Sequence, residues 1–176
     1  MDEITLRTER IYEGRIVKLD LLDVRLPDGK EAKRELITHP GAVAIVALDA
    51  AQNVLIVKQF RSAAQRVLWE IPAGTLHPGE PPHDCAVREL QEETGYFPGK
   101  LEHIGGIYPA PGYTTEFIHL FIATELSESK LEHDEDEFIE VERLSLPEAI
   151  AMIEDGRIAD GKSTAGILRV ARKLEM

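Results

Sequence analysis

The sequence has few of the features that mark secreted or membrane proteins. Its only cysteine is Cys85, which excludes an intrachain disulfide and favours a reducing compartment. The longest apolar run, residues 42–48, is too short to cross a bilayer. The first five residues lack the basic start and the apolar core of a signal peptide. We therefore expect a cytoplasmic location and no association with a membrane.

Basic residues are also in the minority. Twenty Lys and Arg residues face 32 Asp and Glu residues, which gives a formal net charge of −12. Such a surface repels the phosphate backbone of nucleic acids, so we expect no nucleic-acid partner. A small phosphate ligand is still compatible with this charge if a metal ion or a few arginines reverse its sign locally.

The remaining composition is that of a globular protein, with 43% hydrophobic and 30% charged residues in a chain of 176. A chain of this length buries roughly 68–70% of its unfolded surface without disulfides or metals. In the N-terminal region, Val17, Leu19 and Leu21 alternate, which predicts one buried strand face. Strand patterns dominate and helical patterns are few, which indicates a single α+β or α/β domain with a mixed sheet. We expect strands at 15–26, 33–38, 42–48, 54–60, 67–71, 101–107, 116–123 and 138–144, and helices at 81–94, 145–156 and 163–174.

The predicted helix at 81–94 carries an unusual set of acidic residues. Glu89, Glu92 and Glu93 are three and four positions apart, so their carboxylates share one arc of the helix surface. They repel one another, and they lie near the helix C-terminus, where the macrodipole disfavours anions. A divalent cation would reverse each of these effects, and oxygen ligands favour Mg²⁺ or Mn²⁺. A solvated acidic face is the alternative.

A zinc site is a further alternative, because His77, His83 and Cys85 lie close in sequence. Their spacing is not one that zinc sites use, so we do not favour it.

The residues around this helix decide between these alternatives. Gly74 is followed after five residues by Glu80, and after seven more by the segment 88–96, Arg-Glu-Leu-Gln-Glu-Glu-Thr-Gly-Tyr. This pattern resembles the signature of the Nudix hydrolases, without insertion or substitution. Seven fixed positions coincide by chance about once in 10⁸ placements.

The resemblance implies an α/β/α sandwich, the Nudix fold, with a mixed central sheet and an N-terminal antiparallel strand extension. Residues 1–40 would form that extension and make a homodimer by exchanging strands between subunits. Residues 41–176 would form the hydrolase domain, with the signature at 74–96. The chemistry implied is metal-dependent cleavage of a nucleoside diphosphate derivative.

The resemblance also assigns roles to the residues of the signature. Arg88 would pair with carboxylates and orient them, and Glu92 would belong to both the catalytic and the metal-binding set. For Glu80, a structural role and a direct role as ligand both remain open. The implied ligands of Mg²⁺ or Mn²⁺ are the backbone carbonyl of Ala73 and the carboxylates of Glu89, Glu92 and Glu93.

Three segments outside the signature resemble the ADP-ribose pyrophosphatase subfamily. They are Gln59-Phe60-Arg61 with the following 69–74, the proline Pro111 sixteen residues beyond Gly95, and the acidic segment 134–141. The activity implied is hydrolysis of ADP-ribose to AMP and ribose 5-phosphate. Glu137 would be the general base, with Glu135 as the second choice. The implied substrate-binding residues are Arg61, Phe60, Pro111, Gly112 and Tyr113. A solvated position for Arg61, a core position for Phe60 and a plain turn at Pro111-Gly112 are the alternatives.

Other functions remain open at this stage. The tryptophans that some subfamily members use to enclose adenine are absent, and Ile16 and Arg34 stand at the nearest matching positions. Another nucleoside diphosphate sugar or a dinucleotide is therefore an alternative substrate. A Nudix-fold sensor that binds without cleaving is a second alternative, which the intact set of Arg88 and glutamates disfavours. A Ca²⁺-binding module is a third, disfavoured because no EF-hand loop is present.

Overall fold

The computed structural model describes residues 2–129 and 138–175. The chain forms two compact units. One consists of Met1–Gly41 together with Tyr108–Phe117, and the other of Ala42–Ile107 together with Ile118–Met176. None of the described helices is long and apolar enough to cross a membrane.

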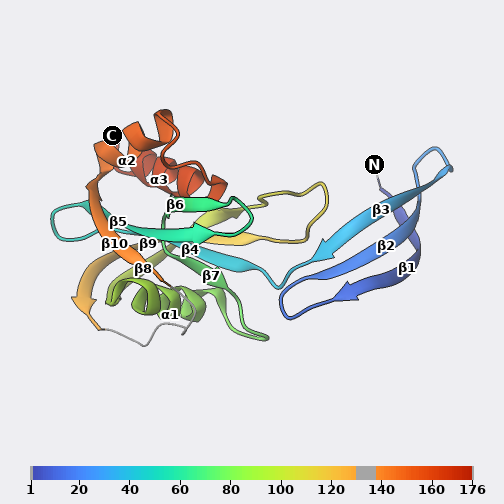
Figure 1. Ribbon diagram of the computed structural model, residues 1–176, viewed down its shortest axis with the longest axis horizontal. Helices are drawn as coiled ribbons and strands as arrows, with labels where there is room; N and C mark the ends of the chain where they lie inside the picture. Colours follow the sequence, from blue (N-terminus) through green and yellow to red (C-terminus); the bar gives the residue numbers. More distant parts are fainter. Residues whose placement is uncertain (1, 130–137, 176) are drawn as a thin grey trace. The chain divides into compact units, whose positions relative to one another are not determined.

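The first unit is built on a three-stranded antiparallel sheet with the strand order β1-β2-β3 (Figure 1). The segment 108–117 is attached to the last of these strands. Ile37 donates its N–H to the carbonyl oxygen of Tyr113 at 2.7 Å, and Thr115 donates its N–H to that of Ile37 at 2.9 Å. The strands are β1 (Ile4–Glu13), β2 (Lys18–Arg25) and β3 (Glu31–Thr38).

The prediction that Val17, Leu19 and Leu21 form the buried face of β2 is wrong. Val17 precedes the strand and is 39% exposed, whereas Asp20 and Val24 are buried. The cause is an ion pair across the sheet, because the guanidinium of Arg10 on β1 binds both carboxylate oxygens of Asp20. The sequence pattern also missed β1, whose residues are all exposed and so show no apolar alternation.

The second unit contains two sheets. In the four-stranded sheet, of order β7-β4-β9-β8, only β4 and β9 run parallel, so the sheet is mixed as predicted. The other sheet has the order β10-β5-β6 and is antiparallel. The strands are β4 (Ala42–Ala47), β5 (Asn53–Arg61), β6 (Arg66–Glu70), β7 (Ala73–Thr75), β8 (Tyr96–Ile107), β9 (Ile118–Glu128) and β10 (Glu140–Ser145).

Helices cover both sides of this unit. They are α1 (Pro82–Thr94), α2 (Leu146–Glu154) and α3 (Gly161–Lys173). Figure 1 shows α1 on one side of the sheets and the pair α2 and α3 on the other. The predicted α/β/α sandwich is therefore confirmed.

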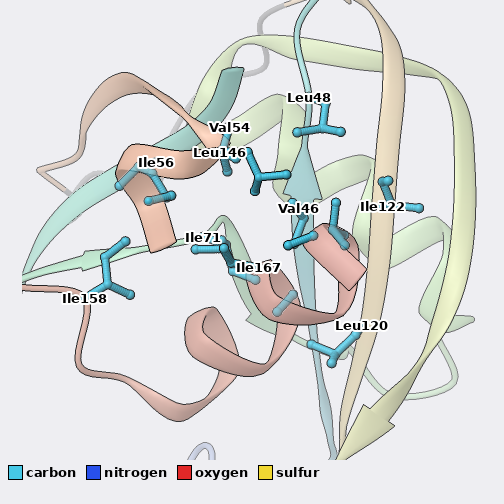
Figure 2. Close-up of a cluster of buried hydrophobic side chains, with 14 of the residues drawn as sticks. Val46, Leu48, Val54, Ile56, Ile71, Leu120, Ile122, Leu146, Ile158 and Ile167 are labelled. Atoms are coloured by element: carbon cyan, nitrogen blue, oxygen red, sulfur yellow. The ribbon is translucent and has the colours of Figure 1, made fainter. Parts of the chain in front are cut away.

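Strand β4 is buried throughout, and its side chains alternate between two apolar clusters. Ala44 and Val46 contribute to the apolar cluster that includes residues of α2 and α3, such as Ile167 (Figure 2). Val43 and Ile45 contribute instead to a second cluster, which includes residues of α1. A strand buried on both faces thus holds the helices in place on either side.

Capping residues explain where the helices begin and end. Gly95 ends α1 in the left-handed conformation with φ 76°, and its N–H bonds to the carbonyl of Gln91. Ser145 and Glu148 form a capping box at the start of α2. Helix α3 begins two residues earlier than predicted, because Asp160 caps it by accepting from Ser163 N–H. Strand β8 begins directly after Gly95, five residues earlier than predicted.

Candidate active site

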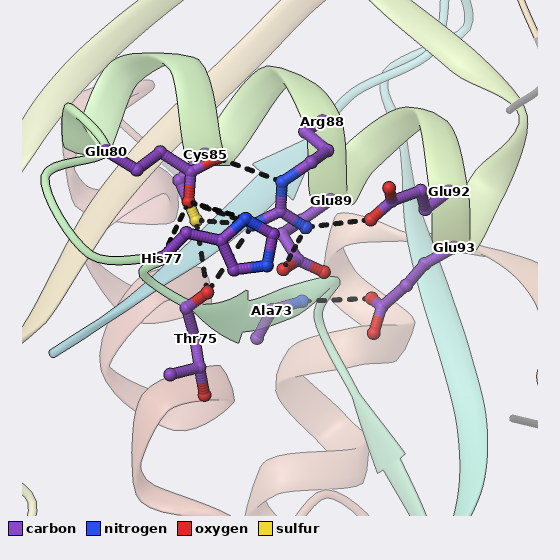
Figure 3. A network of polar contacts seen from close by, with 9 residues as sticks. All are labelled: Ala73, Thr75, His77, Glu80, Cys85, Arg88, Glu89, Glu92 and Glu93. Atoms are coloured by element: carbon purple, nitrogen blue, oxygen red, sulfur yellow. Dashed lines mark hydrogen bonds and ion pairs between the residues drawn. The ribbon is translucent and has the colours of Figure 1, made fainter. Parts of the chain in front are cut away.

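Strand β7 and helix α1 bring two of the acidic side chains to one short stretch of backbone (Figure 3). The carboxylate of Glu93 is buried and accepts a hydrogen bond of 2.9 Å from the N–H of Ala73. Glu89 packs against Gly74, where a Cβ atom would lie 1.9 Å from Oε1 of the carboxylate. Any larger residue at position 74 would displace the Glu89 carboxylate from this place, which gives a physical reason for the first residue of the signature.

Arg88 joins the remaining acidic residues of the signature. Its Nη1 donates to Glu89 at 2.7 Å and to Glu92 at 2.8 Å. Its Nε and Nη2 donate to the two oxygens of Glu80 at 2.9 and 3.0 Å. One guanidinium therefore orients three carboxylates and offsets part of the repulsion that their spacing creates (Figure 3).

The charged pairs shift the acidity of these groups. The pKa of Glu80 is lowered from 4.5 to about 2, chiefly by the hydrogen bonds from Arg88, with a further one from the N–H of His77. Burial raises the pKa of the Cys85 thiol well above its usual range. A neutral thiol is a poor metal ligand. Its sulfur contacts Arg88 and the carbonyl oxygen of Thr75.

The donor set fits a hard divalent cation in its chemistry. Glu89 and Glu93 lie against β7, beside the backbone of Ala73 and Gly74, and every side-chain donor there is a carboxylate oxygen. In the part of the chain that the structure describes, however, no three acidic, histidine or cysteine side chains are close enough together to hold a metal ion. Arg88 instead provides the positive charge between Glu89 and Glu92.

Comparison with known families identifies this loop and helix. The family model of the NUDIX domain matches residues 38–166. The chain belongs to the Nudix family. A second family model, the nucleoside diphosphate sugar hydrolase N-terminal domain, matches residues 3–37.

Individual relatives match nearly the whole chain. An ADP-ribose pyrophosphatase of Bacillus subtilis (strain 168) is 44% identical over 95% of this chain and 91% of its own length. A methanol dehydrogenase activator of Bacillus methanolicus is 42% identical over 94% of this chain and 91% of its own length. The crystal structure of an ADP compounds hydrolase has the same fold, with a TM-score of 0.89 at 22% identity, covering 99% of this chain and 95% of that one.

The other predicted site residues lie in several places. Arg61 ends β5 and pairs with Glu70 of β6, while Phe60 beside it is 55% exposed. Pro111, Gly112 and Tyr113 form the turn of segment 108–117, which belongs to the unit of the N-terminal sheet. Glu135 and Glu137 lie outside the described residues.

Sequence reasoning missed the partners of Arg61. Glu70 is almost fully buried and binds both Arg61 and Lys162 of α3, which is 92 positions further along the chain. A charged residue next to Trp69 in a short apolar strand was the available signal, because ionised groups are rarely buried without partners. The sequence contained no indication that Lys162 is one of those partners.

We expect Arg88→Met to destabilise the metal-free protein. The substitution leaves three partly buried carboxylates without the hydrogen-bond donor that they share. The free energy of unfolding should therefore fall by about 2 kcal/mol. For a chain of this length, the melting temperature should fall by roughly 4–8 °C. Arg157→Met is the control, since its pair with Asp155 is solvent-exposed and should contribute little. Equal melting temperatures for the two variants at pH 7 would contradict this role of Arg88.

Comparing Arg88→Met with the wild type at several pH values also tests the lowered pKa of Glu80. A folded-state pKa of about 2, below the usual 4.5, stabilises the fold above pH 4.5, and this contribution is lost as the pH falls toward 2. Without Arg88, the pKa of Glu80 should return toward its ordinary value. The difference in melting temperature between the wild type and Arg88→Met should therefore narrow between pH 7 and about pH 3. A constant difference would show that Glu80 is not the group involved.

Proposed function

We propose that this chain is a metal-dependent hydrolase that cleaves the diphosphate bond of ADP-ribose, giving AMP and ribose 5-phosphate. The observation that carries the proposal is the similarity along nearly the whole chain to an ADP-ribose pyrophosphatase. The complete Nudix signature supports hydrolysis rather than binding alone. A sensor that only binds its ligand has no need of Arg88 and three glutamates on one helix face.

We propose that Glu89, Glu92, Glu93 and the carbonyl oxygen of Ala73 hold Mg²⁺ or Mn²⁺. At these ligands a divalent cation would supply charge stabilisation for the diphosphate and would lower the pKa of the attacking water. The protein contributes orientation: Ala73 N–H fixes Glu93, and Arg88 fixes Glu89 and Glu92. These contacts hold the carboxylates in place before substrate arrives.

Substrate would be bound by the residues that precede and follow the signature. We assign a phosphate contact to Arg61, because a planar guanidinium can bind phosphate oxygens in pairs. Phe60 of the second unit is more than half exposed, so a base could stack on it. Tyr113 is equally exposed in the first unit, and its stacking role is a separate proposal. Pro111 and Gly112 would shape the turn beside Tyr113. Glu137 would accept the proton of the attacking water, with Glu135 as the alternative.

We also propose that the protein is a cytoplasmic homodimer in which residues 1–40 exchange between subunits. The support is the apolar surface of β1, where Ile4, Leu6, Ile11 and Tyr12 are each at least 41% exposed on an edge strand. Exposed apolar side chains on a strand with free edge groups favour pairing with another chain. The molecular mass in solution, measured by light scattering, distinguishes the dimer from the monomer.

A panel of substrates tests the proposed function. ADP-ribose, a second nucleoside diphosphate sugar, a dinucleotide and a nucleoside triphosphate are each incubated with Mg²⁺, Mn²⁺ or a chelator, and the products are separated by chromatography. We expect the highest kcat/KM for ADP-ribose, with AMP and ribose 5-phosphate as products and no turnover with the chelator. Preference for the other sugar nucleotide would fit the N-terminal family match instead. Binding without any cleavage would identify a sensor.

A further inference from the structure

A second charged cluster lies at the ends of β5 and β6 and the start of α3. At its centre is Glu70, whose side chain is only 2% exposed. Arg61 donates Nε and Nη2 to the two oxygens of this carboxylate, both at 2.8 Å. Nζ of Lys162 also donates to Glu70. Two cations from different elements thus meet at one buried anion.

This pairing fixes the plane of the Arg61 guanidinium. Two parallel hydrogen bonds to a carboxylate allow far less rotation than a single ion pair does. The carboxylate is itself held, because Lys162 binds it from α3 and also donates to Asp160 at 3.0 Å. Asp160 accepts from Ser163 N–H and so joins the cluster to the beginning of the helix. The orientation of Arg61 therefore depends, through Glu70, on the Lys162 side chain of α3.

We propose that Lys162 is a positioning residue for substrate binding. Through Glu70 it fixes the orientation in which the Arg61 guanidinium would meet a phosphate oxygen of a nucleoside diphosphate. The inference rests on the proposed function, in which Arg61 contacts the substrate. It adds a residue of α3 to the determinants of substrate affinity.

The test is steady-state kinetics of Lys162→Met with ADP-ribose and Mg²⁺. We expect KM to rise roughly tenfold with kcat within about twofold of wild type, because a ground-state contact is weakened. Lys162→Arg, which keeps the charge, should restore most of the affinity. The matched control is Lys173→Met on the same helix, since Lys173 pairs with Glu102 at the surface. Its KM should remain that of wild type.

A double-mutant cycle separates positioning from general stabilisation. Arg61→Ala alone should raise KM, and adding Lys162→Met should raise it no further, because both substitutions remove the same contact. Additive effects on KM would overturn the inference. If Lys162→Met does not fold, Lys162→Gln, which can still donate a hydrogen bond, replaces it in the cycle.

The outcomes distinguish this inference from the proposed function. A lower melting temperature with an unchanged KM for Lys162→Met would reduce Lys162 to a structural role and overturn the inference while the proposed function stands. A wild-type protein that hydrolyses none of the diphosphates would overturn both. A raised KM in Lys162→Met that Lys162→Arg restores supports the inference.

Discussion

Glu93→Gln is expected to lower kcat at least about a hundredfold while the fold stays intact. The carboxylate of Glu93 is buried at β7, where it accepts the N–H of Ala73. A glutamine side chain is of the same size and its carbonyl oxygen can accept the same hydrogen bond, so the substitution mainly removes charge. A divalent cation binds the charged carboxylate much more strongly than the neutral amide, so the metal site should be weakened. Turnover at saturating Mg²⁺ and the melting temperature of the metal-free protein measure the two effects separately.

Asp84→Asn is the matched control for this experiment. Asp84 lies in the first turn of the same helix, is solvent-exposed and takes no part in the proposed site. Its kcat should equal that of wild type. The melting temperature of metal-free Glu93→Gln should stay the same or rise, because one of three repelling charges on the helix is gone. Near-normal turnover of Glu93→Gln at saturating Mg²⁺ would remove this residue from the metal site.

The helix that carries the site could be predicted from the sequence because its determinants are local. Proline in the first turn, glycine at the C-terminus and the spacing of the glutamates are all set within one segment. The same holds for the capping box that begins α2. Strand β4 was equally clear, since a strand buried on both faces has an unbroken apolar run.

The contacts that hold the site together could not be predicted, because they join distant parts of the chain. Strand β7 has three residues and depends on pairing with β4, so no periodicity marks it. Its Gly74 and Ala73 determine where the carboxylates of α1 lie. In the first unit, the prediction for β2 failed for a similar reason. Asp20 is buried because Arg10 of the neighbouring strand binds it, and the pattern within β2 does not show this partner.

Replacing the general base should also lower kcat strongly. If Glu137 takes the proton from the attacking water, Glu137→Gln should lower kcat roughly a hundredfold with little change in substrate affinity. The amide of glutamine cannot accept the proton. The substitution removes no proposed metal ligand and no proposed substrate contact. Glu135→Gln is the control of the same chemistry two positions away. It should have a mild effect, because it removes only a more distant negative charge.

The pH dependence of kcat identifies which of the two glutamates is the base. Without the general base, hydroxide must attack in place of water that the base has deprotonated. The rate of Glu137→Gln should therefore rise more steeply with pH than that of wild type. Profiles of both variants at saturating metal are compared. An active Glu137→Gln beside an inactive Glu135→Gln would move the role to Glu135. If both variants are active, the base lies on α1 itself, with Glu92 or Glu93 as the next residue to replace.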